Sequence, residues 1–327
     1  MLDYYKFRPK KENNLNTLNI IHKISNLKRL SFLSLVKMKG DFFMNNEKNK
    51  KLWLKKCEET LELGGRSKTT IRNYTYSINH FLNSYSNNKK ISDFKEETII
   101  EYMQKNYMNN NCSANTYNFN LSVIKFFYSV CFNKEFSKRT LPKSKVPRRL
   151  PKIISKQDFI YIINNDNNLE HKCWLLLSFC SGLRVEEIAT LKIEGIDSKN
   201  HKLRIIGKGN KERNTILPDI TIKFLRLYYK SKKMKVKSGY LFKGTEGNEH
   251  ISKNTIGNYF TNLSKELQLD DGISFHTLRH SFATYYLMNG GNAFVLKDML
   301  GHRSLSTTAI YIHLANNFNQ LEGIKYV

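Results

Sequence analysis

The N-terminal half of the chain has apolar residues at the three- and four-residue spacing that marks one face of an α-helix. Such stretches cover residues 52–63, 69–85, 99–103 and 114–131. No alternation of apolar and polar residues competes with this spacing, so strands are not expected here. The pattern predicts a small bundle of about four helices over residues 47–136.

The C-terminal half, residues 153–327, has a mixed pattern. Short apolar runs at 202–206 and 214–217 flank a turn rich in Gly, Asn and Lys, which is typical of a β-hairpin. The other apolar stretches have helical spacing, and Ser155 and Ser306 precede two of them as N-cap residues would. The predicted helices cover residues 156–164, 174–180, 220–229, 253–267, 277–288, 293–300 and 307–314. The predicted fold class is mainly α with a small β-sheet.

A basic, proline-rich segment at residues 137–152 separates the two halves. It holds Pro142, Pro147 and Pro151, and proline at this density disfavours helix and favours an extended chain. Two interpretations stay open. The segment is either a strap that lets two basic domains close around DNA, or an ordinary exposed linker.

Residues 1–46 form a basic, Asn-rich extension of unknown role. It is either a flexible extension or translated sequence upstream of a start at Met44.

The N-terminus lacks the apolar core of a signal peptide. The most apolar stretches, residues 30–36 and 173–180, are too short to cross a bilayer. We therefore expect a soluble, cytoplasmic protein without membrane contact.

The composition adds a strong positive charge, with a formal net charge of +26. Basic residues outnumber acidic ones in residues 46–150 and again in residues 151–327, as expected if both domains face one polyanion such as DNA. The alternative is a basic protein with solvated lysines and no such partner. The five cysteines include no CxxC pair, which disfavours a disulfide scaffold and a zinc site.

Three segments of the chain carry residues suited to attack on a phosphodiester. That reaction needs a nucleophile, cations on the non-bridging oxygens and a proton donor for the leaving oxygen. Arg184 and Arg279 suit the cationic role, because a guanidinium binds phosphate through two parallel hydrogen bonds. The alternative for one arginine alone is a surface salt bridge, which the apolar surroundings of Arg184 disfavour.

The remaining candidates are His276, His302 and Lys208, which can move protons, and Tyr311, which can act as nucleophile. Each has a structural alternative. A single histidine is more often a packing or surface residue, and Lys208 lies in a turn that could be a plain phosphate-binding loop. Tyr311, nine residues after His302, could be a core tyrosine.

Taken together, these residues resemble the catalytic set of the tyrosine recombinase (phage integrase) family, most closely its Xer-like members. The resemblance covers about residues 47–327. It is strongest in residues 181–191, 207–213, 276–284 and 300–314. The six catalytic positions of the family are matched in order by Arg184, Lys208, His276, Arg279, His302 and Tyr311.

The resemblance implies a role for each of these residues. Arg184 and Arg279 would hold the scissile phosphate. Tyr311 would attack it, leaving a 3′-phosphotyrosyl link and a free 5′-hydroxyl. Lys208 would protonate the leaving oxygen, and His276 would assist proton transfer with Tyr311.

The resemblance also implies the rest of the reaction and its partners. His302 would support the same phosphate. Because the covalent link conserves the energy of the broken bond, no ATP, metal or other cofactor is expected. A 5′-hydroxyl from a partner duplex would reverse the step, and strands would exchange through a Holliday junction on a ring of four protomers. The expected partners are double-stranded DNA in the nucleoid, further copies of a chain that is monomeric when free, and a second recombinase or accessory factor. Residues 316–327 would pack on a neighbouring protomer.

The predicted domains take their roles from the same resemblance. Residues 47–136 resemble the SAM-like core-binding domain of the family, and residues 153–327 its α+β catalytic domain, which together imply a C-shaped DNA clamp. Contacts to phosphates would set position rather than sequence. The expected DNA contacts are Lys68, Arg72, Asn115, Lys125, Arg148, Arg149, Lys211 and Arg213.

Two other functions compete with that of a site-specific recombinase. A type IB topoisomerase-like enzyme would use the same chemistry to relax supercoils without a partner duplex or a specific site. A catalytically silent DNA-binding protein would bind equally well without the Tyr311 hydroxyl. The linker and the C-terminal tail disfavour the first alternative, and the intact catalytic set disfavours the second.

Overall fold

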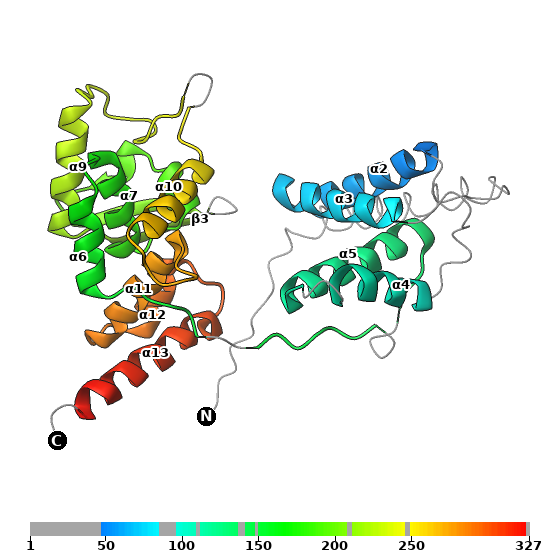
Figure 1. The fold of residues 1–327 in the computed structure, drawn as a ribbon. Coiled ribbons are helices and arrows are strands. Elements are labelled where there is room, and N and C mark those ends of the chain that lie inside the picture. The colour runs from blue at the N-terminus through cyan, green and yellow to red at the C-terminus, as the bar shows by residue number, and fades with distance from the viewer. Residues whose placement is uncertain are drawn as a thin grey trace, which may run out of the picture. The chain divides into compact units, whose positions relative to one another are not determined.

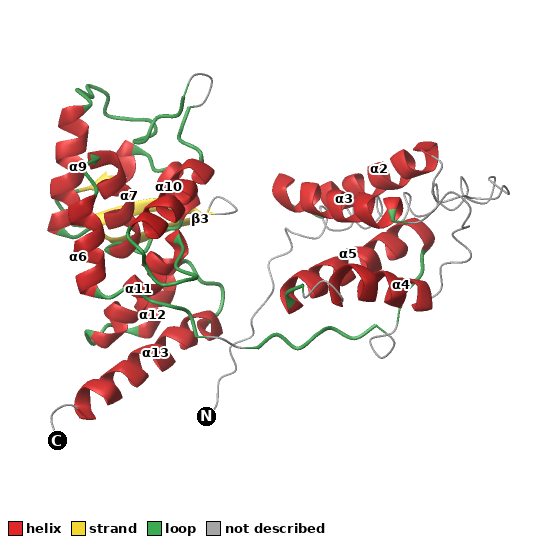
Figure 2. Ribbon diagram, in the orientation of Figure 1, coloured by secondary structure: helices red, strands yellow, loops and turns green. Residues whose placement is uncertain are grey.

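The computed structural model describes residues 47–84, 96–108, 112–136, 141–147, 150–207, 211–245 and 249–324. The chain divides into two compact units, the first ending at Pro147 and the second beginning at Arg148. Both units are mainly helical, and each has its own apolar core (Figure 1, Figure 2). The extension at residues 1–46 lies outside the described residues.

The first unit is a helical bundle. Its elements within the described residues are α2 (Glu47–Leu63), α3 (Lys68–Asn83), α4 (Glu96–Met103), the π-helical turn η2 (Gln104–Met108) and α5 (Ala114–Phe132). Ser67 and Ser113 cap α3 and α5 by accepting hydrogen bonds from backbone N–H groups of the first turn. The aromatic rings of Trp53, Phe81 and Phe127 pack edge to face in the core.

The second unit combines helices with a small antiparallel sheet. The strands are β1 (Ile196–Asp197), β2 (Lys202–Gly207) and β3 (Lys211–Ile216), in the spatial order β1-β2-β3. The hairpin of β2 and β3 is the one predicted, whereas the two-residue strand β1 was not expected. The helices are α6 (Lys156–Asn165), α7 (Leu169–Phe179), α8 (Val185–Ala189), the 3₁₀ turn η3 (Ile193–Gly195), α9 (Asp219–Ser231), α10 (Lys253–Glu266), α11 (Phe275–Met288), α12 (Ala293–Leu300) and α13 (Leu305–Ile324).

The last helix, α13 (Leu305–Ile324), is longer than predicted. We expected a helix over residues 307–314 behind Ser306 as N-cap, and this prediction was wrong at both ends. At the start of the helix the Ser304 hydroxyl, not that of Ser306, accepts a hydrogen bond from the backbone, namely from the Ser306 N–H at 3.2 Å. At the other end Phe318 packs against the core formed by α11, α12 and α13, so the apolar face continues beyond the polar residues that suggested a stop.

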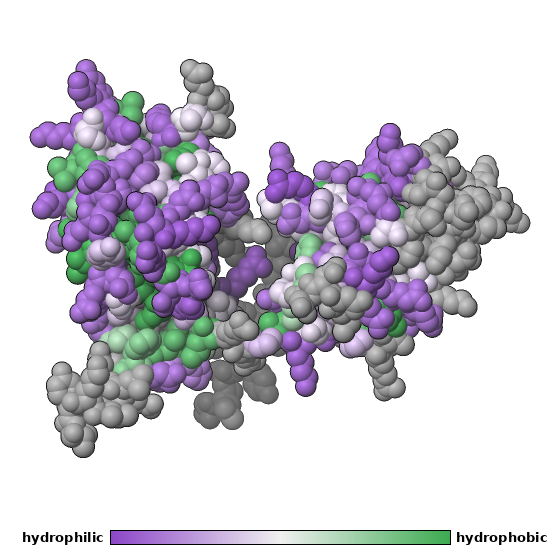
Figure 3. Space-filling model, viewed as in Figure 1, coloured by the Kyte–Doolittle hydropathy of each residue, from purple (hydrophilic) through white to green (hydrophobic). Residues whose placement is uncertain are grey.

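The surface of both units is largely hydrophilic, with a hydrophobic patch over α12 and α13 in the second unit (Figure 3). Phe294 and Val295 at the start of α12 are 65% and 48% exposed. Across the described ranges, every helix is too short or too polar to span a bilayer.

Candidate active site

The chain reverses tightly after α7, and this turn places Arg184 at the entrance of α8. Gly182 has a φ of +71°, which favours glycine. A Cβ atom at this position would lie 2.5 Å from the ring of Phe282 on α11. The turn therefore requires glycine for its conformation and for its close packing. Arg184 follows in an extended conformation, with its side chain 36% exposed.

Arg279 lies in the second turn of α11 and is 1% exposed. Its Nη1 donates to the carbonyl of Gly182, and its Nη2 donates to the carbonyl of Leu300, both at 2.6 Å. Burial, followed by the charge of Arg184, lowers the pKa of Arg279, but a guanidinium keeps its proton at neutral pH. Arg279 thus ties the glycine turn to the end of α12.

A buried carboxylate, Glu187 in α8, lies at the centre of this cationic cluster. Arg213 from β3 donates two hydrogen bonds to Glu187, at 2.8 and 2.7 Å. The Arg213 Nε donates to the Met299 carbonyl at 2.7 Å. Arg184 donates to the same carboxylate through Nη1 at 3.0 Å and through its backbone N–H at 2.8 Å. The Arg279 Nη1 lies 3.6 Å from Oε2. One carboxylate therefore holds three guanidinium groups from separate elements.

The charges of this cluster leave an excess of positive potential. Burial acts to raise the pKa of Glu187. The hydrogen bonds and charge of Arg213, with support from Arg184 and Arg279, outweigh burial and hold that pKa below its usual value. Glu187 is thus ionised at neutral pH, and a single carboxylate cannot neutralise three guanidinium groups. The site favours an anionic ligand such as a phosphate.

Tyr311 reaches this cluster from α13. It is 3% exposed, and its hydroxyl lies 2.8 Å from Nδ1 of His280 on α11. The ring of His302 is nearly parallel to the tyrosine ring, with an interplanar angle of 15° and 6.2 Å between the centroids. Burial raises the pKa of Tyr311, whereas the charges of Arg279 and Arg184 act to lower it.

The histidines of the site are neutral at neutral pH. Burial, followed by the charges of Arg279 and Arg184, lowers the pKa of His302 to about 4. Burial, followed by the charges of His276 and Arg279, lowers the pKa of His280 to about 4. The more exposed His276 is shifted in the same direction. Neutral imidazoles have a lone pair and can accept protons.

Most of the predicted catalytic residues come together in this one site. They are Arg184, His276, Arg279, His302 and Tyr311. Lys208 belongs to the turn between β2 and β3 and lies outside the described residues. Its place relative to the other residues stays a prediction.

The predicted DNA contacts of the first unit have different surroundings. Lys68 and Arg72 on α3 are exposed, as is Asn115 on α5. Lys125 on α5 is partly buried, and its Nζ donates to the Leu141 carbonyl at 2.9 Å. Lys125 therefore braces the segment after the bundle in this structure.

Arg213 needs a correction among the predicted DNA contacts of the second unit. Its side chain is 10% exposed, and its guanidinium is directed inward to Glu187 and Met299. We therefore no longer expect a DNA contact from it. Arg148 and Arg149 lie outside the described residues, as does the side chain of Lys211.

Sequence reasoning missed two residues of the site, Glu187 and His280. Glu187 follows Arg184 by three residues and lies in the first turn of α8. His280 follows His276 by four residues, so the two share one face of α11. That spacing pointed to His280, because a histidine one turn from a candidate catalyst faces the same space.

The donor set of the site suits an anion better than a metal ion. Three guanidinium groups surround its one carboxylate, and neighbouring cations repel a metal. In the part of the chain that the structure describes, no group of three or more His, Cys, Asp or Glu side chains could hold a metal.

Comparison with known proteins identifies the family. Residues 152–317 match the phage integrase family, and residues 53–138 match the N-terminal SAM-like domain of phage integrases. The chain belongs to the phage integrase family. Tyrosine recombinase XerA from Pyrococcus horikoshii is 31% identical over 256 residues, which cover 77% of this chain and 85% of the relative. Tyrosine recombinase XerD from Staphylococcus saprophyticus is 26% identical over 268 residues, which cover 77% and 90%.

Solved structures of such proteins have the same fold. The XerH site-specific recombinase bound to its palindromic difH substrate has a TM-score of 0.66 and 19% identity, over 83% of this chain and 82% of that chain. A lambda integrase dimer bound to a core site has a TM-score of 0.62 and 16% identity, over 79% and 93%. The predicted fold class is confirmed: a SAM-like helical domain precedes a mainly helical catalytic domain with a small sheet.

Family membership also confirms the predicted activity. This tyrosine recombinase is an enzyme that breaks and rejoins DNA strands in site-specific recombination.

Proposed function

We propose that Tyr311 is the nucleophile of this recombinase. Its hydroxyl attacks a phosphodiester of double-stranded DNA, forming a 3′-phosphotyrosyl bond and releasing a 5′-hydroxyl. The observation that carries the proposal is the convergence of Tyr311 with Arg184 and Arg279, which come from separate segments and place excess positive charge beside the hydroxyl. Preorganised cations of this kind stabilise the charge that develops on a phosphate in the transition state.

The two arginines hold the scissile phosphate in this proposal. The Arg184 side chain is partly exposed and accessible to DNA. Arg279 uses two N–H groups for the carbonyls of Gly182 and Leu300, but a guanidinium has five N–H donors, so further donors remain for a phosphate oxygen.

The remaining catalytic residues handle the phosphate and the protons. His302 supports the phosphate, Lys208 protonates the leaving 5′-oxygen, and His276 assists proton transfer. The phosphotyrosyl ester conserves the energy of the broken bond, so rejoining requires neither ATP nor a metal. Attack by a 5′-hydroxyl of a partner duplex then yields a Holliday junction and exchanged strands.

Strand exchange between two duplexes requires four active sites, so we propose that four copies assemble on DNA from a monomer free in solution. A second recombinase or an accessory factor can join this assembly. The C-terminal residues 316–327 would contact a neighbouring copy. The extended helix α13 and the exposed Phe294 and Val295 on α12 support this idea.

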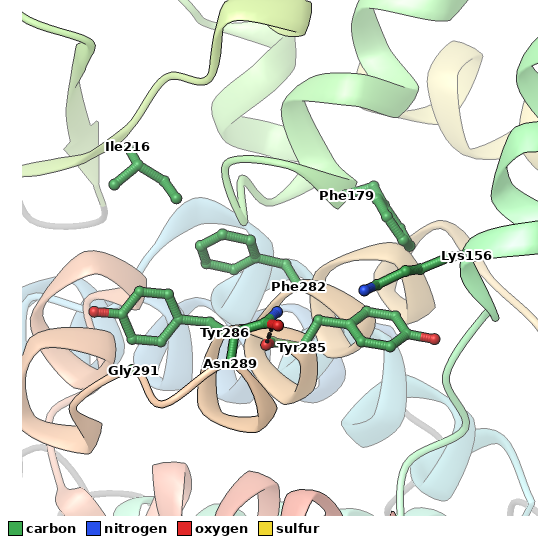
Figure 4. Close-up of a pocket in the computed structure, with 8 residues that line it drawn as sticks. All are labelled: Lys156, Phe179, Ile216, Phe282, Tyr285, Tyr286, Asn289 and Gly291. Atoms are coloured by element: carbon green, nitrogen blue, oxygen red, sulfur yellow. Dashed lines mark hydrogen bonds between the residues drawn. The ribbon is translucent and has the colours of Figure 1, made fainter.

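An apolar pocket offers a second place for a segment of a neighbouring copy. It has a volume of about 310 Å³ and lies between α7, α11 and β3 (Figure 4). Phe179, Phe282 and Tyr286 line it, and Lys156 stands at its edge. Light scattering with and without DNA would test the assembly, since a chain truncated after residue 315 should remain monomeric on DNA.

The first unit binds DNA in this proposal, as a core-binding domain over residues 47–136. The linker covers residues 137–152 and the catalytic domain residues 153–327. The match of a SAM-like family domain to residues 53–138 supports this division. Exposed Lys68 and Asn115 in the first turns of their helices, where helix N-termini favour anions, and exposed Arg72 in the second turn of α3 would contact phosphates. The enzyme would act in the cytoplasm, on nucleoid DNA.

Covalent trapping tests the proposed nucleophile. The protein is mixed with a pool of nicked suicide duplexes, denatured and separated, and a protein–DNA band is sought. We expect this band for the wild type and for Tyr286→Phe, whose side chain lines the apolar pocket, and no band for Tyr311→Phe.

The other outcomes of these experiments distinguish the competing functions. A band that persists in Tyr311→Phe would show that another residue is the nucleophile. If DNA recovered by affinity selection binds tightly and in a salt-sensitive manner but gives no covalent band, the silent DNA-binding protein would be favoured. Relaxation of supercoiled plasmid without site preference would favour a topoisomerase-like activity.

A further inference from the structure

A hydrogen bond joins the proposed nucleophile to a histidine outside the predicted catalytic set. His280 Nδ1 lies 2.8 Å from the Tyr311 hydroxyl, with 5.6 Å between the ring centroids. The contact links α11 to α13 across the apolar core that these helices form with α12. Among the residues that the structure describes, the Tyr311 hydroxyl has no other hydrogen-bond partner.

The direction of this hydrogen bond follows from the chemistry of the two groups. A neutral imidazole has one N–H and one lone pair, and a phenol has a single proton to donate. If His280 donated from Nδ1, the buried Tyr311 proton would have no acceptor among the described residues, which is costly. Nδ1 therefore accepts from the tyrosine, and Nε2 has the imidazole proton.

The other two histidines of the site are not placed for this contact. The Nδ1 of His302 is 2.9 Å from the Thr308 hydroxyl, and its ring is nearly parallel to that of Tyr311 with 6.2 Å between the centroids. His276 is exposed and packs edge-on against His280, with 4.5 Å between the centroids. His280 is thus the histidine within hydrogen-bond reach of the reacting oxygen.

We propose that His280 is the general base that takes the proton from Tyr311 during cleavage; this inference rests on the proposed function of Tyr311. The phenol O–H bond breaks as its proton moves to Nδ1, and the phenolate oxygen forms the bond to phosphorus. The bond from phosphorus to the 5′-oxygen breaks, and a separate donor, Lys208 in the proposed function, protonates that oxygen. When the strand is rejoined, the imidazolium returns its proton to Tyr311.

DNA itself would strengthen this base. In the free protein burial, followed by the charges of His276 and Arg279, disfavours a positive charge on His280. A phosphodiester bound by Arg184 and Arg279 brings a negative charge next to the imidazole, which favours its protonated form. His276, which packs against His280, then assists the proton transfer as a neighbour of the base and does not itself take the proton.

The test compares His280→Asn with the wild type on two DNA substrates in single-turnover cleavage. The Asn side chain offers an amide oxygen near the position of Nδ1, so it keeps a hydrogen bond to Tyr311 but cannot take its proton. One substrate is ordinary suicide DNA, and the other has sulfur in place of the bridging 5′-oxygen at the scissile phosphate. A thiolate leaves without protonation, so this substrate removes the need for an acid but not the need for a base.

We expect His280→Asn to slow cleavage about 100-fold or more on both substrates. This factor is the lower end of the rate enhancement that a general base contributes. Lys208→Ala should lose cleavage on ordinary DNA and regain it on the sulfur substrate. His280→Ala should recover in part with added imidazole, which provides a second measurement if the Asn variant folds poorly. DNA affinity of the His280 variants should equal that of the wild type.

Three results would overturn the assignment. Wild-type cleavage by His280→Asn would show that the hydrogen bond only positions Tyr311. Faster cleavage would show that His280 restrains the nucleophile, and rescue of His280→Asn by the sulfur substrate would place His280 on the leaving-group side. Adduct formation by Tyr311→Phe, run in parallel, would instead refute the proposed nucleophile, so the two failures are distinguishable.

Discussion

Replacing Glu187 by Gln removes the negative charge at the centre of the arginine cluster and nearly preserves its shape. The carboxylate is 7% exposed and accepts two hydrogen bonds from Arg213 and two from Arg184. An amide keeps one acceptor oxygen and turns an NH₂ group toward guanidinium donors. The Arg213 guanidinium, 10% exposed, then becomes a buried cation without its counter-ion.

The cost of that change can be estimated from the burial of the pair. Removing one partner of a buried ion pair costs about 3–5 kcal/mol. For a unit of this size 1 kcal/mol corresponds to roughly 2–4 °C in Tm, so we expect Glu187→Gln to lower Tm by roughly 6–20 °C. The adjacent Glu186 is the matched control, because it is 63% exposed and contacts Lys253 at the surface. A pair of this kind contributes about 0–1 kcal/mol.

The assay follows the second unit alone by tryptophan fluorescence. The chain has two tryptophans, Trp53 in the first unit and Trp174 in the core of the second. In a Trp53→Phe background, the thermal transition of Trp174 reports only on the unit that contains Glu187. Equal Tm values for Glu187→Gln and Glu186→Gln would refute the reasoning. Glu187→Gln should also slow single-turnover cleavage, because Arg184 and Arg279 lose a shared anchor.

The same carboxylate predicts a dependence of stability on pH. The pKa of Glu187 in the folded protein lies below the usual 4.5. Its contribution is therefore complete above about pH 4.5 and is lost as the pH falls through the folded-state pKa. Between pH 7 and pH 3, Tm of the wild type should fall more than Tm of Glu187→Gln. Parallel losses of Tm in the two proteins would contradict this assignment.

Three further predictions follow from the site and the first unit. Gly182→Ala should lower Tm and the rate of cleavage, because the new Cβ would lie 2.5 Å from a buried ring and the φ of this residue is +71°. Gly257→Ala in α10 is the control and should raise Tm slightly, because nothing lies within 4 Å of its new Cβ. Equal losses of Tm in both variants would count against a role for the turn. Arg213→Gln should lower Tm without changing the slope of log affinity for DNA against log salt. A slope reduced in magnitude by about 0.9 would instead show that Arg213 contacts a DNA phosphate. Lys68→Ala and Arg72→Ala should each reduce that slope by about one phosphate contact and leave Tm unchanged, which a filter-binding titration at several salt concentrations can measure.

The sequence predicted the elements of the fold well where the pattern is local. The helical spacing of the first unit and the Gly-rich hairpin of the second appear in the structure close to their expected limits. The end of α13 was missed because polar residues after residue 315 suggested a stop. Contact of Phe318 with the core, which depends on α11 and α12, continues the helix.

Partner choice within the site could not be predicted in the same way. Arg213 follows a lysine-rich turn, which favoured a DNA-facing role, yet its partner Glu187 lies 26 residues away in sequence. Only the packing of β2 against α8 and of β3 against α12 brings the two together. The chemistry of each residue was visible in the sequence, but the distances that decide between a DNA contact and an internal ion pair arise from the tertiary fold.

The arrangement of charges connects DNA binding to the chemical step. In the free protein the cationic cluster surrounds a single carboxylate. Burial, followed by the charges of His276 and Arg279, keeps the pKa of the proposed base His280 low. A phosphodiester entering between Arg184 and Arg279 would offset that charge. On this proposal His280 becomes a stronger base only when the phosphate lies where Tyr311 can attack it. Because the base gains strength from the substrate itself, a buried tyrosine can remain protonated and unreactive until DNA is in place.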